Sequence, residues 1–153
     1  MEIRQWMTHP VVCLKPLDSV QHARELMEKH RINQLPVVLD GKLVGIVTDR
    51  DVRDASPSVF DAPPRRKRKG HAASDPRAIP AEGVMSPGVL ALGPHESIVE
   101  AARLMARERI GSVPIVEGGH LVGILTRSDL LKALVAMAEG VSPAAGAAGA
   151  RRS

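Results

Sequence analysis

The 153-residue chain is poor in aromatic side chains and in cysteine. Trp6 and Phe60 are its only aromatic residues, and Cys13 is its only cysteine. Proteins that hold single-stranded nucleic acid usually stack its bases on aromatic rings, so a surface of that kind is excluded. One cysteine cannot form an internal disulfide, and no apolar run approaches the roughly 20 residues of a membrane span. The charged N-terminal residues do not resemble a signal peptide, so we expect a soluble, cytoplasmic protein.

Patterns typical of enzymes and metal sites are missing as well. The six histidines are scattered without the spacing of zinc ligands. The sequence has no nucleophile elbow, no phosphate-binding P-loop and no dinucleotide fingerprint. Cys13 has no catalytic context and falls in an expected strand, so we expect a buried, inert thiol. We therefore predict no catalytic residues, no metal and no enzymatic activity.

The net charge of +4 comes from two parts of the chain. Residues 56–83 carry a charge of +3, residues 141–153 carry +2, and the remainder is close to neutral. The positive charge is densest in the run Arg65–Lys69. This run is either a solvated linker or a contact for nucleic acid, for an acidic partner or for phosphates. Five charges in a flexible loop would bind with strong salt dependence and low specificity.

The chain contains an internal repeat. Residues 7–52 align without a gap with residues 85–130, at an offset of 78, and 19 of the 46 pairs are identical. Ordinary residue usage would give about three identical pairs by chance. A copy of 46 residues is too short to bury a core comfortably by itself, so we expect two half-domains that share one core. The predicted organisation is repeat 1 over 1–55, a flexible basic linker over 56–83, repeat 2 over 84–140 and a disordered tail over 141–153.

Both copies predict the same order of elements. Short apolar strands over 11–14 and 89–92 precede helices that begin after the N-cap residues Ser19 and Ser97. Ser97 also has capping-box spacing to Glu100. Two apolar runs follow in each copy, joined by Asp40-Gly41 or by Gly118-Gly119, which are typical of tight hairpins. A second helix ends each copy. We thus predict an α/β (α+β) fold of two β-α-β-β-α repeats.

One motif occurs at the same place in both copies. It reads Gly, two apolar residues, Thr, two polar residues and Asp, over 45–51 and over 123–129. Each copy places the Thr at the end of a strand and the Asp in the first turn of a helix. A hydroxyl and free backbone N–H groups at a helix start can hold a phosphate, and a carboxylate can accept both ribose hydroxyls. The same residue types are also ordinary helix caps, which leaves the structural interpretation open.

These features together resemble a pair of cystathionine-β-synthase (CBS) domains, also called a Bateman module. The resemblance rests on the repeated motifs, on the element order, and on the segments Ile32–Val37 and Ile110–Ile115. It covers nearly all of residues 1–139 apart from the linker. Residues 48–58 resemble more narrowly the acetoin-utilisation type of two-CBS protein, here without the ACT domain that often follows in that type.

The resemblance implies two repeats related by a pseudo-twofold axis, with AMP, ADP, ATP or, less favoured, S-adenosylmethionine in the clefts between them. By position, Asp51 and Asp129 would hold ribose hydroxyls, and Thr48 and Thr126 would contact phosphate. The adenine would lie against two sets of residues, Val12, Cys13, Gln34, Leu35 and Pro36, and Leu90, Ala91, Ser112, Val113 and Pro114. The family also commonly forms homodimers through helical faces.

Three arginines lie beside the motifs, and each is either a phosphate contact or an exposed surface charge. They are Arg50, Arg53 and Arg127. Two of them adjoin the first motif and one adjoins the second, which suggests unequal phosphate preference. The sequence thus predicts a regulatory module that senses adenine nucleotides. The alternative is a nucleic-acid or protein adaptor that uses residues 65–69 on a dimeric scaffold.

Overall fold

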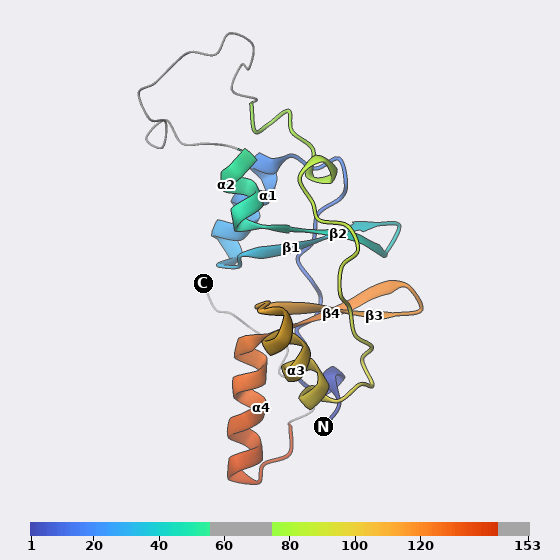
Figure 1. Ribbon diagram of the computed structural model, residues 1–153, viewed down its shortest axis with the longest axis vertical. Helices are drawn as coiled ribbons and strands as arrows, with labels where there is room; N and C mark the ends of the chain where they lie inside the picture. The colour runs from blue at the N-terminus through green and yellow to red at the C-terminus, as the bar shows by residue number, and fades with distance from the viewer. Residues whose placement is uncertain (56–74, 144–153) are drawn as a thin grey trace. The chain divides into compact units, whose positions relative to one another are not determined.

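The computed structural model describes residues 1–55 and 75–143 (Figure 1). The helices are α1 (Val20–His30), α2 (Asp49–Ala55), α3 (Ile98–Glu108) and α4 (Arg127–Glu139). The strands are β1 (Gln34–Leu39), β2 (Lys42–Thr48), β3 (Ser112–Glu117) and β4 (His120–Thr126). Two short 3-10 helices, η1 (Ile3–Gln5) and η2 (Ala81–Gly83), precede the two copies of the repeat. The basic run Arg65–Lys69 lies outside the described residues.

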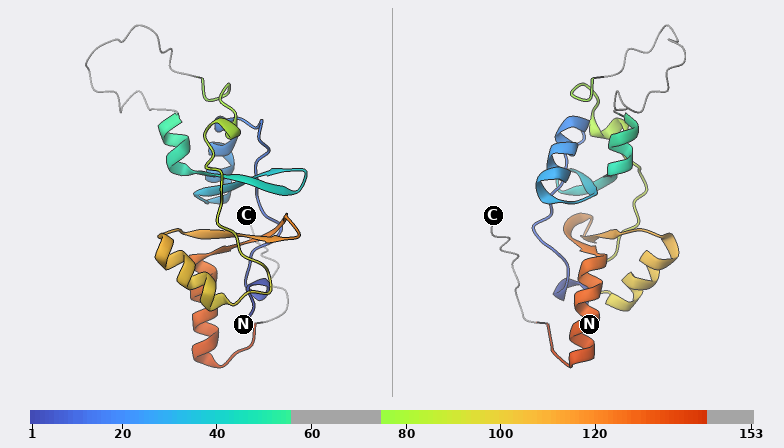
Figure 2. Two further views of the ribbon diagram at one scale, coloured as in Figure 1. Left: turned by 45° about the vertical axis from the view of Figure 1, so that its right-hand side comes forward. Right: turned by 90° about the vertical axis from the view of Figure 1, so that its left-hand side faces the viewer.

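The chain forms two compact units. The first unit spans Val12–Val89, and the second combines Met1–Val11 with the described residues from Leu90 onward. Each unit has one antiparallel hairpin, β1–β2 or β3–β4, with α1 and α2 or α3 and α4 beside it (Figures 1 and 2). The predicted α/β class and the duplication of one folding unit are confirmed.

The helix starts are capped as the sequence predicts. Ser19 accepts a hydrogen bond from the backbone N–H of His22 at 3.0 Å, and Ser97 accepts one from Val99 at 3.1 Å. These bonds satisfy amide donors that the first helical turn leaves without a partner. The predicted return bond from Glu100 is not seen, because that carboxylate pairs with Arg103 at 2.5 Å.

The two hairpin turns follow from residues that tolerate a left-handed backbone. Asp40 and Gly41 have φ angles of 51° and 80°, and Gly118 and Gly119 have 57° and 83°. Positive φ at both central positions matches the right-handed twist of the flanking strands. The hairpins predicted at both places are confirmed.

Buried residues form two clusters, one in each unit, instead of the single shared core predicted from the length of the copies. The first cluster holds Leu14, Val20, Ala23, Met27, Leu35, Val37, Val47, Val52 and Ala81. The second holds Ile3, Ile98, Ala101, Met105, Val113, Ile115, Leu125 and Ala133. A 46-residue copy can have its own core here because residues from outside the copy contribute to it.

Those added residues come from the segment that precedes the other copy. Ile3 in η1 is fully buried in the second unit, and its N–H donates to the carbonyl of Glu96 at 2.9 Å. Ala81 in η2 is fully buried in the first unit, and its N–H donates to the carbonyl of Asp18 at 2.7 Å. Figures 1 and 2 show η1 beside α3 and η2 beside α1. The end of the predicted linker, around residue 81, is therefore part of the first core.

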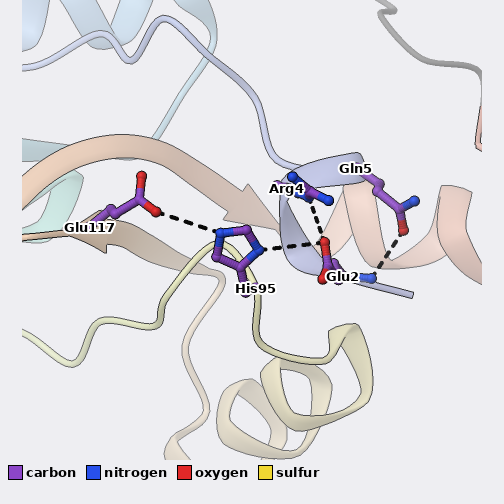
Figure 3. Close-up of polar contacts among 5 residues, drawn as sticks. All are labelled: Glu2, Arg4, Gln5, His95 and Glu117. Atoms are coloured by element: carbon purple, nitrogen blue, oxygen red, sulfur yellow. Dashed lines mark hydrogen bonds and ion pairs between the residues drawn. The ribbon is translucent and has the colours of Figure 1, made fainter.

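Polar contacts also hold the N-terminal residues in the second unit (Figure 3). The Glu2 carboxylate lies 2.5 Å from Nε of Arg4 and 3.6 Å from Nδ1 of His95. The other ring nitrogen of His95 lies 3.6 Å from Glu117 at the end of β3. Glu2 therefore links η1 to the turn before α3, within the same unit.

Two expectations about the first segment of each copy are wrong. Residues 11–14 and 89–92 form no strand, and each makes a single parallel bridge, Leu14 with Val37 and Leu92 with Ile115. Proline lacks an N–H, so the prolines that flank these segments limit further pairing. Cys13 is exposed and not buried, because the neighbouring Leu14 is the side chain that enters the core.

Candidate functional site

The repeated motif lies at the junction of a strand and a helix in each unit. β2 ends at Thr48 and α2 begins at Asp49, while β4 ends at Thr126 and α4 begins at Arg127. These junctions place the hydroxyl and the carboxylate of each motif three residues apart in the first turn. The predicted position of the motif, between strand end and helix start, is confirmed.

The glycine of each motif is required by packing. A Cβ atom built at Gly45 would lie 2.8 Å from Cγ of Met85, and one built at Gly123 would lie 2.9 Å from Cγ of Met7. Each methionine is the first residue of one copy and packs against the hairpin of the other. The glycine of each motif therefore leaves the room that the exchanged methionine needs.

In the first motif, Thr48 and Asp51 form a reciprocal cap. The Thr48 N–H donates to Oδ2 of Asp51 at 2.8 Å, and the Asp51 N–H donates to the Thr48 hydroxyl at 3.2 Å. Asp51 is partly buried, and among the described residues its second oxygen, Oδ1, accepts no hydrogen bond. One carboxylate oxygen is therefore open to a further donor.

The second motif has the same reciprocal cap, and the Asp129 carboxylate makes two further contacts. The Thr126 N–H donates to Oδ2 of Asp129 at 2.9 Å, and the Asp129 N–H donates to the Thr126 hydroxyl at 3.3 Å. The Thr126 hydroxyl also lies 2.7 Å from the same Oδ2, and Nζ of Lys132 lies 3.3 Å from Oδ1. Asp129 is only 3% exposed. Sequence reasoning missed Lys132, although its i, i+3 spacing from Asp129 on a helix was a usable signal.

The predicted phosphate-binding arginines differ in their partners. Arg53 pairs with Asp49 at 3.2 Å, and Arg50 lies 3.9 Å from Asp54. Arg127 forms no ion pair with any described residue, and its backbone N–H donates to the carbonyl of Gly111 at 3.1 Å. Acidic side chains of α2 thus lie beside its two arginines, whereas Arg127 has no acidic partner among the described residues.

The residues predicted to contact adenine are brought close to one another within each unit. The Leu14 N–H donates to the carbonyl of Pro36 at 2.8 Å, which fixes residues 12–14 beside β1, and the Leu92 N–H donates to Pro114 at 3.2 Å. Four of these residues, Leu35, Pro36, Val113 and Pro114, are fully buried, and Ser112 is also buried. Val12 and Gln34 are partly buried, and Cys13, Leu90 and Ala91 are exposed. A planar ligand here would contact the exposed side chains and backbone edges.

Partial burial raises the pKa of the Cys13 thiol above its ordinary value, with the negative charge of Asp18 as the smaller cause. A raised pKa keeps the thiol protonated and poorly nucleophilic. This direction agrees with the inert thiol predicted from the sequence, although the Cys13 side chain is exposed.

One hollow of about 340 Å³ adjoins the second motif. It lies between α3 and α4 and is lined by Ala102, Met105, Ala106, Arg109, Arg127 and Leu130. Of the predicted site residues, only Arg127 contributes to it. Among residues 1–55 and 75–143, no three His, Cys, Asp or Glu side chains are placed to hold a metal, and no helix is both long and apolar enough to span a bilayer.

Comparison with known proteins agrees with the repeated fold and motifs. A family model for the CBS domain matches residues 3–58 and 81–136. The chain belongs to the CBS domain family. It is 32% identical over 128 residues to the CBS domain-containing protein YhcV of Bacillus subtilis. That alignment covers 84% of this chain and 81% of YhcV. It is 35% identical over 121 residues to inosine-5'-monophosphate dehydrogenase of Korarchaeum cryptofilum, but there it spans only 21% of the relative.

Solved CBS structures show the same architecture. The acetoin utilization protein AcuB of Vibrio cholerae has a TM-score of 0.75 and 28% identity, with 91% of this chain and 93% of that one covered. CBSX2, solved in complex with AMP, has a TM-score of 0.73 and 26% identity, with 90% of this chain and 98% of that one covered. The CBS pair of MJ0100, solved with 5'-methylthioadenosine and S-adenosyl-L-methionine, has a TM-score of 0.70 and 26% identity. The match covers 90% of this chain and 98% of that one. The predicted tandem CBS pair and its resemblance to the acetoin-utilisation type are confirmed.

Proposed function

We propose that this CBS pair is a regulatory module that binds an adenosine-containing ligand, of which AMP, ADP and ATP are favoured over S-adenosylmethionine. The supporting observation is the carboxylate of Asp51, which has an unused oxygen beside the Thr48 hydroxyl at a strand-to-helix junction. Relatives of the same fold were solved with AMP and with S-adenosyl-L-methionine. The proposal places the chain in the cytoplasm and assigns it no catalytic step of its own.

The chemistry of the proposed site is hydrogen bonding. An ionised carboxylate only accepts hydrogen bonds, so Asp51 and, by position, Asp129 suit the two hydroxyls of a ribose. Thr48 and Thr126 lie at helix starts, where a hydroxyl and the helix dipole favour a phosphate. Arg127, which has no ion-pair partner among the described residues, adds a positive charge at the second junction.

We also propose that the chain forms a homodimer through α4. Four large apolar side chains of this helix, Leu131, Leu134, Val135 and Met137, are between 53% and 63% exposed. In both views of Figure 2, the C-terminal half of α4 extends beyond α3. An apolar helix face of this size is typical of an interaction surface, and a second copy would cover it with the same residues.

The adaptor function that uses residues 65–69 has no support from the described residues, which do not include that run. It makes a different prediction, because replacing the run by Gly and Ser would abolish a salt-sensitive shift of DNA or RNA. The nucleotide-binding proposal predicts that this replacement leaves ligand binding unchanged.

A thermal-shift titration tests the proposed function. Ligand at a hundredfold excess over its dissociation constant stabilises the folded protein by about 2.7 kcal/mol, which corresponds to a rise in Tm of roughly 5–10 °C for a chain of this size. AMP, ADP, ATP and S-adenosylmethionine are compared, with GMP as the control for the base. The proposal fails if none of the adenosine compounds raises Tm.

A further inference from the structure

The two motifs have the same residue types but different hydrogen-bond capacity. Oδ2 of Asp51 accepts one backbone N–H, and Oδ1 accepts nothing among the described residues. Oδ2 of Asp129 accepts both the N–H and the hydroxyl of Thr126, and Oδ1 faces the ammonium of Lys132 at 3.3 Å. Three donors thus contact the two oxygens of Asp129. Only one donor contacts the carboxylate of Asp51, and its Oδ1 is free among the described residues.

One position in the repeat accounts for the difference at Oδ1. Lys132 aligns with Asp54 in the first copy. A carboxylate cannot donate to Asp51, and Asp54 lies beside Arg50 on the outer surface of α2. The second copy therefore has a cation where the first has an anion, one helical turn after the ribose-binding position.

Burial strengthens the effect of Lys132. Asp129 is 3% exposed, and the ammonium of Lys132, 3.3 Å from Oδ1, is one of the groups that cover it. Asp51, in contrast, is partly exposed. Because Lys132 itself is mostly exposed, it can be removed without opening a cavity in the core.

We infer that the first motif alone holds the ribose, through Asp51, and that Asp129 caps α4 with its remaining oxygen closed by Lys132. This inference rests on the proposed function and adds its occupancy, which is one nucleotide per chain. Lys132 is then the residue that determines the number of sites.

Isothermal titration of the full chain tests the inference. AMP, ADP, ATP and S-adenosylmethionine are titrated in turn, and the compound that gives the most heat is used to compare all variants. The wild type is expected to bind about one nucleotide per chain, and Lys132→Ala about two, because removing the ammonium frees Oδ1 of Asp129. Asp51→Asn is expected to weaken binding by at least about tenfold. The double variant Asp51→Asn/Lys132→Ala should regain about one site.

Lys42→Ala is the matched control, because Lys42 is an exposed lysine in the hairpin of the first copy with no ion pair among the described residues. It should bind as the wild type does. Two equal sites in the wild type would overturn the inference and leave the proposed function standing. A single site in Lys132→Ala would overturn the role of Lys132. The absence of heat from AMP, ADP, ATP and S-adenosylmethionine in every variant would overturn the proposed function itself.

Discussion

The helices that follow the two motifs differ more than any other pair of equivalent elements. α2 has Val52 as its only buried residue, and its outer surface carries the ion pairs Arg53–Asp49 and Arg50–Asp54. α4 runs for 13 residues and exposes an apolar face. Arg53 of α2 aligns with Leu131 of α4 at the repeat offset of 78 residues. Duplication thus preserved the junction while the surfaces behind it diverged.

This difference separates two tasks. The first unit keeps a partly exposed carboxylate next to a charged, hydrated helix, which suits binding a small polar molecule. The second unit closes its carboxylate and presents Leu131 and Leu134, which suits contact with another protein surface. The repeats therefore share a fold and, under our proposals, differ in function.

The largest expected effect concerns the segments that the repeats exchange. Ile3 in the second unit occupies the position of Ala81 in the first, so Ile3→Ala gives the second unit the residue of the first. Because Ile3 is fully buried, the change should lower the free energy of unfolding by about 2–5 kcal/mol. Urea unfolding followed by the fluorescence of Trp6, which packs against the second core, reports on that unit.

Leu17→Ala is the control for Ile3→Ala, because Leu17 is 79% exposed and its truncation should change stability by less than about 0.5 kcal/mol. A loss below about 1 kcal/mol in Ile3→Ala would show that the N-terminal segment does not complete the second core.

The next effect should be equal in the two units. Gly45→Ala and Gly123→Ala each force a methyl group against a methionine, Met85 or Met7, and each should cost about 1–3 kcal/mol. Thermal unfolding of the single variants and of the pairs with Met85→Ala or Met7→Ala measures the coupling. The cost of the alanine should shrink when the methionine is absent. Unequal costs would mean that the segments are held differently in the two units.

Much of the fold could be predicted from the sequence because it depends on local rules. Ser19 and Ser97 cap helices, Asp40-Gly41 adopts the backbone that a tight hairpin needs, and the periodic Met27 is buried. Residues 11–14 were misassigned because an apolar run has the composition of a strand, whereas only Leu14 of this run pairs with β1, through a single parallel bridge to Val37. The wrong prediction that Cys13 is buried followed from the same misassignment.

The candidate site was only partly predictable. The Thr and Asp of each motif lie where the sequence placed them, since a strand end and a helix start determine both positions. The exchange of segments was not predicted, because Ile3 and Ala81 contact residues far away in the sequence. The ion pairs of Arg50 and Arg53 were also missed, although Asp49 and Asp54 lie four residues from their partners, a spacing that favours pairing on a helix.

A smaller effect is expected on the dimer. Leu131→Arg gives α4 the side chain that α2 has at the equivalent position, and its charge would have to be buried against a second copy. We expect dimerisation to weaken by at least about tenfold, with little change in the folding of the chain. Light scattering after size-exclusion chromatography measures the mass. Arg53→Leu, the reverse exchange, should leave the mass unchanged, and a dimer that persists in Leu131→Arg would place the interface elsewhere.

The smallest effect concerns Glu2, which aligns with the non-ionisable Pro80 of the first unit. The hydrogen bond from Arg4, assisted by the charges of Arg4 and His95, holds the pKa of Glu2 below its ordinary value near 4.5. The carboxylate therefore stabilises the fold above about pH 4.5, and this contribution is lost as the pH falls through the lowered pKa. At pH 6 the Tm of Glu2→Gln should lie slightly below that of the wild type, and the two should converge as the pH falls through the lowered pKa of Glu2. Glu82→Gln, an exposed glutamate of η2, is the control and should show no such convergence. A constant difference across the pH range would mean that Glu2 acts through packing and not through its charge.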